Sequence, residues 1–180
     1  APTADEMRQM KALVAQGMAD GAFGISTGLR YLPGNFSKID EVIELSRVAA
    51  DSGGIYTSHL REEGLGLLDG VAEAITIGRE AKIPIVLTHH KAVGPKTWGQ
   101  SVATLRMVDS ARRAGIDVMM DVYPFTATST GLAVLIPTWA FDGGDTAFTR
   151  RLREPAVRDS IKKGIVFNLL NDRGGGDISR

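Results

Sequence analysis

The chain has 180 residues, which is enough for one domain with its own core but short of the roughly 250 residues of a complete (β/α)₈ barrel. Its 21 Lys and Arg residues equal its 21 Asp and Glu residues, so we expect no binding of nucleic acid or anionic membranes through bulk charge. Hydrophobic residues make up 43% of the chain and cysteine is absent, which excludes global disorder, disulfides and cysteine ligands within these residues.

Helix-like and strand-like segments alternate along the first 130 residues. Apolar residues recur at helical spacing up to Gly21, and a β-compatible run, GAFGIST, follows. Ser37 is the expected N-cap of the second helix. Three further helix–strand pairs are predicted: SKIDEVIELSRVAADSG with GIYTSH, LLDGVAEAITIGREAK with IPIVLTHH, and SVATLRMVDSARRAG with IDVMMDVYPF.

The ends of the four predicted strands recur at the length of one βα module. Thr27, His59, His89 and Tyr123 follow one another at intervals of 30 to 34 residues. The last three strands are apolar runs that turn polar only at their C-terminal ends, which is typical of parallel strands covered on both faces. A doubly wound sheet and part of a closed barrel both fit this pattern, and both gather the polar strand ends at one rim. No GxGxxG or GxxxxGK[ST] motif favours a nucleotide-binding sheet.

The alternation stops after Thr130, so we divide the chain into segments 1–130 and 131–180. The second segment is expected to be a small inserted α/β element or a lid. It contains a charged helix, TRRLREPAVRDSIKKG, interrupted at Pro155, and a candidate strand, IVFNLL.

All three histidines follow two neighbouring predicted strands. Two imidazoles at adjacent strand ends can hold one zinc ion, so His59 and His89 form a candidate, incomplete metal site. His90 directly follows His89 and should point to the other face, where a structural role is expected. Asp121 is a weak candidate for a third ligand.

Four strings, in this order and spacing, resemble the N-acyl-D-amino-acid deacylase (D-aminoacylase) family of the amidohydrolase superfamily. The similarity covers about residues 15 to 135 and continues loosely into the terminal GGGDISR. Because the chain begins without Met and ends on a glycine-rich stretch, we expect an internal piece of a longer protein. The strings are GAFGISTGLRYLPG, GIYTSHLREE, IVLTHHKAVG and MMDVYPFTATST.

The resemblance implies an α/β fold, a partial TIM (β/α) barrel whose four consecutive parallel βα units correspond to strands four to seven. It also implies zinc-dependent hydrolysis of the amide bond of N-acyl-D-amino acids, with His59 and His89 as zinc ligands. The family's cysteine ligand, first-strand histidines and catalytic aspartate have no counterpart here, so we expect these residues alone to be inactive.

Four residues match family positions around the substrate carboxylate. A lysine and hydroxyl groups are suitable donors to a carboxylate, and the matching residues are Tyr31, Lys91, Tyr123 and Ser129. Arg61 could pair with Glu62, Glu63 or the substrate, and we favour an ion pair within the protein.

The expected partner is a small N-acyl-D-amino acid, and the open barrel edges could also support self-association. No long apolar run or signal-peptide pattern occurs, so we expect a cytoplasmic protein. Two alternatives stay open: another amidohydrolase, such as a dihydroorotase-like or hydantoinase-like cyclic amidase, and a non-catalytic, doubly wound binding module.

Overall fold

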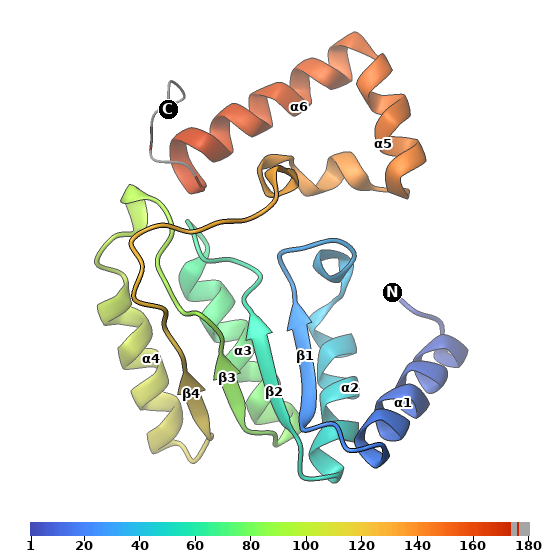
Figure 1. The fold of residues 1–180 in the computed structure, drawn as a ribbon, viewed down its shortest axis with the longest axis vertical. Coiled ribbons are helices and arrows are strands. Elements are labelled where there is room, and N and C mark those ends of the chain that lie inside the picture. Colours follow the sequence, from blue (N-terminus) through green and yellow to red (C-terminus); the bar gives the residue numbers. More distant parts are fainter. Residues whose placement is uncertain (174–175, 177–180) are drawn as a thin grey trace.

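The computed structural model describes residues 1–173 and 176, and its centre is a sheet of four parallel strands in the order β1-β2-β3-β4 (Figure 1). The strands are β1 (Gly24–Gly28), β2 (Ile55–His59), β3 (Ile85–Leu87) and β4 (Val118–Met120). The helices are α1 (Ala4–Ala19), α2 (Ile39–Asp51), α3 (Leu67–Ala81), α4 (Ser101–Arg113), α5 (Gly144–Arg153) and α6 (Pro155–Phe167). The predicted α/β fold with four consecutive βα units is thus confirmed.

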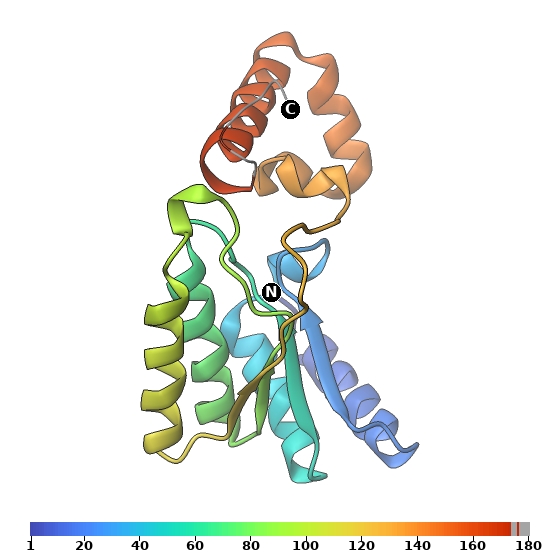
Figure 2. The same cartoon turned by 60° about the vertical axis from the view of Figure 1, so that its left-hand side comes forward.

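Helices α2, α3 and α4 cover one face of the sheet, and the core lies between the two layers (Figure 2). Tyr56, Ile85 and Val118 point from the strands into this core, where they are fully buried. Along β2, buried residues alternate with partly exposed ones, so His59 lies on the opposite side from Tyr56.

No described element covers the other face of the sheet within residues 1–173. The sequence pattern instead predicts strands that are covered on both faces. On β4, Val118 is fully buried whereas Met119 is 43% exposed. The apolar run that follows β4 is also exposed at Val122 and Phe125. Helices α2, α3 and α4 all lie on one face, so apolar residues that the sequence predicted as core are in contact with solvent on the other face.

Strands β3 and β4 are each three residues long, shorter than the sequence patterns predicted. The backbone leaves the β conformation after Leu87, and His89 has a left-handed conformation with φ of 44°. Residues 88–94 and 121–131 therefore run as irregular segments above the sheet.

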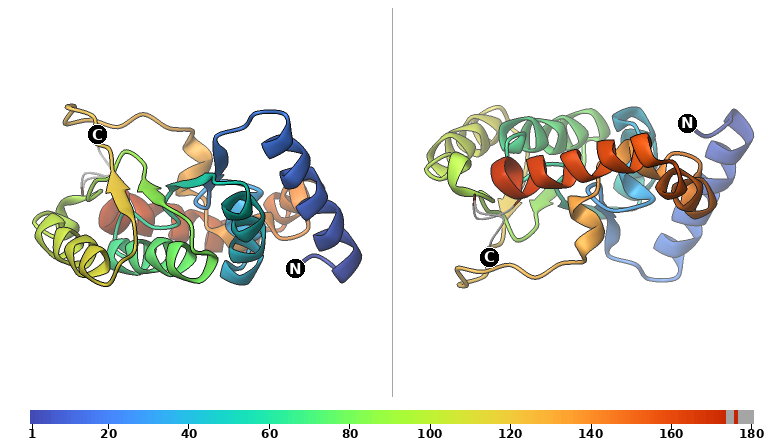
Figure 3. Two further views of the ribbon diagram at one scale, coloured as in Figure 1. Left: turned by 90° about the horizontal axis from the view of Figure 1, so that it is seen from below. Right: turned by 90° about the horizontal axis from the view of Figure 1, so that it is seen from above.

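The C-terminal segment lies above the C-terminal ends of the strands (Figure 1). Short helical turns η3 (Leu132–Leu135) and η4 (Thr138–Phe141) lead into α5 and α6. Seen from above, α6 crosses over the βα layers (Figure 3). Pro155 begins α6, as expected for a residue that lacks an N–H but suits the first helical turn.

Two local predictions were wrong. The IVFNLL stretch is helical, since α6 continues into a π-helical turn, η5 (Asn168–Asp172), with no neighbouring strand to pair with. Lys38 rather than Ser37 is the N-cap of α2, and the Ser37 hydroxyl donates to the Glu41 carboxylate instead. Apart from Gly176, the terminal GGGDISR lies outside the described residues.

None of the helices in the described part of the chain is both long enough and apolar enough to cross a membrane.

Tyr56 gives the core a measurable dependence on alkaline pH. Burial raises the pKa of Tyr56 above its usual value of 10.0. Because the folded state holds the phenol proton more tightly than the unfolded chain, this contribution to stability is complete below pH 10 and is lost as pH rises further. We expect the free energy of unfolding to fall above pH 10 and the tyrosinate absorbance of Tyr56 to appear together with unfolding. The Tyr56→Phe variant should lose this part of the pH dependence; an unchanged profile would contradict the assignment.

Candidate functional site: a histidine pair over a buried glutamate

The parallel register brings the polar ends of the strands together. Gly28 of β1 is in register with His59 of β2, and Ser58 is in register with Leu87 of β3. His89 comes two residues after Leu87, so the two histidines belong to neighbouring strand ends. The sequence predicted this meeting point from the spacing of the modules alone.

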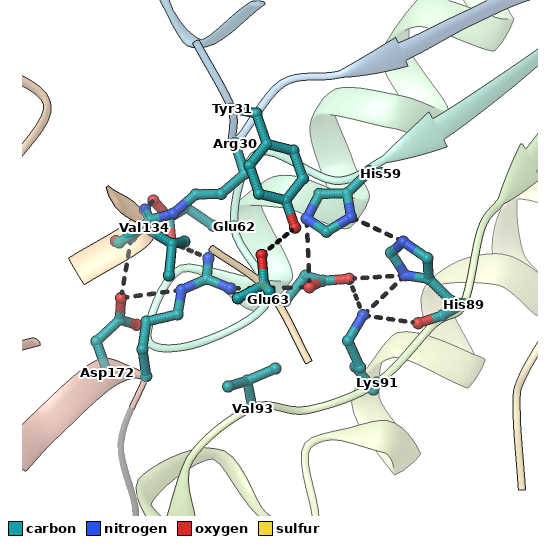
Figure 4. A network of polar contacts seen from close by, with 12 residues as sticks. Arg30, Tyr31, His59, Glu62, Glu63, His89, Lys91, Val93, Val134 and Asp172 are labelled. Atoms are coloured by element: carbon teal, nitrogen blue, oxygen red, sulfur yellow. Dashed lines mark hydrogen bonds and ion pairs between the residues drawn. The ribbon is translucent and has the colours of Figure 1, made fainter. Parts of the chain in front are cut away.

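The rings of His59 and His89 face each other at this rim (Figure 4). Nδ1 of His59 lies 2.7 Å from Nε2 of His89, and the ring centroids are 4.5 Å apart. Both side chains are partly buried. The two imidazoles therefore offer nitrogen atoms to one shared position.

The turn after β3 holds His89 in place. The carboxylate of Asp121 accepts a hydrogen bond of 2.6 Å from the backbone N–H of His89, and the Asp121 carbonyl accepts one from His90. These bonds compensate a left-handed conformation that residues other than glycine rarely adopt. Asp121, the weak ligand candidate of the sequence, thus positions the backbone of a histidine.

His90 lies away from the pair. Its side chain is buried, and Nε2 is 2.8 Å from the hydroxyl of Thr104 on α4. It points toward the helical layer, as predicted, although the turn at His89 rather than regular strand alternation sets its direction.

Glu63 is the central residue that the sequence reasoning did not select. It lies in the loop after β2, and its side chain is only 1% exposed. Its carboxylate is 2.6 Å from Lys91 Nζ, 3.3 Å from His89 Nδ1 and 3.6 Å from His59 Nε2. Its spacing of four residues from His59 was the available signal, but the sequence did not distinguish it from Glu62.

A network of charges connects Glu63 to the C-terminal segment. Arg173 lies 3.7 Å from the Glu63 carboxylate and 3.4 Å from that of Glu62. Arg30, after β1, pairs with Glu62 at 2.7 Å and donates to the carbonyl oxygen of Val134. The loops after β1 and β2 and both ends of the C-terminal segment therefore meet at these ion pairs.

Asp172 makes a second connection at the same place. Its carboxylate accepts a hydrogen bond of 2.9 Å from the backbone N–H of Leu65. The approach requires glycine at position 64, since a Cβ there would lie 1.9 Å from the Asp172 carboxylate oxygen. The end of η5 is thus attached directly to the loop that carries Glu63.

A cavity of about 650 Å³ opens in front of the histidines. All four residues predicted to contact the substrate line it: Tyr31, Lys91, Tyr123 and Ser129. The Tyr31 ring lies 4.6 Å from that of His59, and its hydroxyl is 3.0 Å from the hydroxyl of Thr130. Apolar side chains from the C-terminal segment, including Leu132, form another part of the wall.

Lys91 is held by three acceptors. Its ammonium group lies 2.6 Å from Glu63, 2.7 Å from Nδ1 of His89 and 2.9 Å from the His89 carbonyl oxygen. It is also 5.6 Å from the centre of the Tyr123 ring. The predicted proximity of Lys91 to His89 is therefore present, although the extended conformation assumed for it is not.

His59 stays neutral at physiological pH in this environment. Burial lowers the pKa of His59 from 6.5 to about 3, and the nearby charges of His89, Lys91, Arg173 and Arg30 act in the same direction. A neutral imidazole has a free electron pair, which a metal ligand needs.

The group formed by His59, Glu63 and His89 is able to hold a metal ion. One ligand atom from each residue lies within 4.8 Å of the others. Two imidazoles beside a carboxylate are a suitable donor set for zinc. In addition, Nε2 of His59 is buried without a hydrogen-bond partner, which indicates that the arrangement is not complete in itself.

Arg61 forms an ion pair within the protein, but its partner is Glu73 of α3 rather than Glu62 or Glu63. Its guanidinium group contacts both Glu73 oxygens at 2.9 to 3.0 Å and donates to the carbonyl oxygens of Asn35 and Ser37. Arg61 therefore connects β2 to α3 and to the loop after β1.

Replacing Arg61 should affect stability and not metal binding. We expect Arg61→Gln to lower the free energy of unfolding by about 1.5 to 3 kcal/mol, because hydrogen bonds to charged, partly buried groups are lost. Denaturant unfolding measures this change. The control is Arg79→Gln, which removes the exposed Arg79–Glu80 pair and should cost less than about 1 kcal/mol. Equal effects of the two substitutions would show that the Arg61 network does not stabilise the fold.

Comparison with known proteins gives a consistent family. An N-acyl-D-glutamate deacylase of Alcaligenes xylosoxydans xylosoxydans is 43% identical over 148 residues, which is 82% of this chain and 30% of that protein. A D-aminoacylase of the same organism is 41% identical over 132 residues, covering 73% of this chain and 27% of that protein. No family model matches the chain.

A solved structure shows the same fold. The N-acyl-D-glutamate deacylase of Bordetella bronchiseptica, in complex with zinc and a phosphonate inhibitor, superimposes with a TM-score of 0.68 at 41% identity. The match covers 69% of this chain and 26% of that one, so the chain spans less than a third of the length of its relatives. On sequence and fold together, the chain belongs to the N-acyl-D-amino-acid deacylase family of amidohydrolases.

Proposed function

We propose that this chain supplies part of the active site of a zinc-dependent deacylase. The reaction is hydrolysis of the amide bond of an N-acyl-D-amino acid, which releases a carboxylic acid and a D-amino acid. The observation that carries the proposal is the meeting of His59 and His89, with nitrogens 2.7 Å apart, at the mouth of a 650 Å³ cavity. The similarity to deacylases over most of the chain supports it.

His59 and His89 are the residues proposed to hold zinc. Bound zinc lowers the pKa of a coordinated water and polarises the amide carbonyl. From the family resemblance we expect a third ligand and the catalytic aspartate outside these residues, so we assign no catalytic base here. The two histidines therefore contribute only part of the activating site.

The substrate carboxylate is proposed to bind four residues of the cavity wall: Lys91, Tyr31, Tyr123 and Ser129. Lys91 provides a positive charge at the cavity wall, and the three hydroxyl groups can donate oriented hydrogen bonds. The segment 131–180 is proposed to act as a lid, since its described part lies above the C-terminal ends of the strands (Figure 1) and supplies apolar residues to the cavity wall. Such a lid would exclude water and shape the space for the acyl group.

A cytoplasmic location remains part of this proposal. Self-association through the outer edges of β1 and β4 also remains part of it, since neither edge has a neighbouring strand within residues 1–173.

Metal content tests the two proposed ligands in the natural polypeptide that carries these residues. We expect His59→Ala and His89→Ala each to remove most of the bound zinc, because the site loses one of its few nitrogen donors. His90→Ala is the matched control and should keep zinc, since its ring contacts Thr104 instead. Elemental analysis after dialysis measures the content. Equal losses for His89→Ala and His90→Ala would refute the ligand assignment.

Activity tests Lys91 separately from the metal. We expect Lys91→Ala to keep zinc but to lose about 30- to 1000-fold in kcat/KM for an N-acyl-D-amino acid, which corresponds to roughly 2 to 4 kcal/mol. The variant should also discriminate less between a free substrate carboxylate and its amide. Lys96→Ala, at an exposed lysine that contacts Asn171, is the control and should behave like wild type. Near-normal kcat/KM in Lys91→Ala would show that the carboxylate is bound elsewhere.

A further inference from the structure

The Glu63 carboxylate lies next to both histidine rings, near the nitrogen of each ring that does not contact the other ring. His59 and His89 approach each other through Nδ1 of the first and Nε2 of the second. The remaining nitrogen of each ring lies near a different oxygen of Glu63: His59 Nε2 is 3.6 Å from Oε2, and His89 Nδ1 is 3.3 Å from Oε1 (Figure 4). One carboxylate is therefore shared by two rings.

We propose that Glu63 is a positioning residue that fixes the orientation and protonation of both metal-binding histidines at once. This inference rests on the proposed zinc site. A histidine that binds zinc through one nitrogen usually donates its other N–H to a carboxylate or carbonyl, which sets the ring direction and strengthens the ligand. Here a single buried carboxylate lies next to both rings. If it accepted a proton from each ring in the zinc-bound protein, His59 Nδ1 and His89 Nε2, which hydrogen-bond each other in this structure, would be left to bind the metal.

The unpaired Nε2 of His59 supports this role. It is buried without a hydrogen-bond partner, which costs free energy unless a partner is gained. Glu63 Oε2 is the acceptor in front of it, at 3.6 Å. Two nitrogens on one tetrahedral zinc lie roughly 3.3 Å apart, given Zn–N bonds of about 2.0 to 2.1 Å. The two nitrogens, now 2.7 Å apart, would therefore have to separate slightly to share a zinc ion, and a shift of His59 toward Glu63 would bring Nε2 within hydrogen-bond distance of Oε2.

The surroundings fix the position of the Glu63 carboxylate. Lys91 and Arg173 both contact its carboxylate, and the Glu63 carbonyl accepts a hydrogen bond of 2.8 Å from the N–H of Val93. A carboxylate held by two cations and anchored at its backbone is suited to orient a neighbour.

The same geometry affects Lys91. All three of its ammonium hydrogens have acceptors here: Glu63, His89 Nδ1 and the His89 carbonyl. When His89 Nδ1 carries a proton for Glu63, it no longer accepts from Lys91. One Lys91 N–H then becomes available to the cavity, where the substrate carboxylate is proposed to bind.

Zinc affinity measured by chelator competition tests the proposal without relying on activity. In the natural polypeptide, Glu63→Gln should weaken zinc binding about 10- to 100-fold, because an amide cannot accept from both rings. Glu62→Gln is the matched control: it is the adjacent residue, contacts Arg30 and Arg173 and touches neither histidine, so its affinity should match wild type. Thermal unfolding of the metal-free variants identifies any loss caused by misfolding.

A second measurement needs no Glu63 variant. In the zinc-loaded wild-type protein, ¹⁵N NMR of histidine side chains, assigned with single histidine substitutions, should show the proton of His59 on Nε2 and that of His89 on Nδ1. If Glu63 instead bound the metal directly, His59 Nε2 and His89 Nδ1 would bind it as well. The protons would then lie on His59 Nδ1 and His89 Nε2, the opposite pattern. That pattern, or equal zinc affinities of Glu63→Gln and Glu62→Gln, would overturn the inference. Zinc retention in both His59→Ala and His89→Ala would instead overturn the proposed function on which it rests.

Discussion

The buried charge of Glu63 is the constraint around which the rim of the sheet is arranged. The side chain of Glu63 is only 1% exposed, and burying a carboxylate is costly unless cations and hydrogen-bond donors surround it. Lys91 comes from the loop after β3, and Arg173 comes from the far end of the chain. Each must be in place for the charge to be compensated, so the conformations of three separate segments depend on one side chain.

This dependence connects the C-terminal segment to the histidines. Asp172 at the end of η5 and the following Arg173 contact residues 62–65, while Arg30 holds the beginning of the segment at Val134. A displacement of η5 would therefore remove a cation from Glu63. In the proposed enzyme, the position of the lid and the geometry of the zinc ligands are coupled through a single carboxylate, which is a local electrostatic connection and needs no change in the sheet.

The open face of the sheet is the other consequence of the fold. Tyr56 and Val118 are buried under the helices, while Met119 and Val122 on the other side are exposed. Apolar strand residues of this kind are usually covered in α/β proteins. The match spans only 30% of the length of the N-acyl-D-glutamate deacylase, and strands that close a barrel would cover this face in the proposed enzyme.

The sequence by itself determined the order of helices and strands, their parallel direction and the place where His59 and His89 meet. These features follow from short-range periodicity and from module length, which do not require knowledge of distant contacts. Only the tertiary structure distinguishes Glu63 from the other two charged residues of the string REE. Arg61 pairs with Glu73 of α3, Glu62 pairs with Arg30, and Glu63 is buried beside Lys91 at the ends of the strands. Tertiary contacts also set the turn at His89, whose N–H donates to the Asp121 carboxylate. IVFNLL is helical, and the four-stranded sheet of the described residues places no strand beside it. For Glu63 and His89 the deciding partners are distant in sequence, so the local pattern could not identify them.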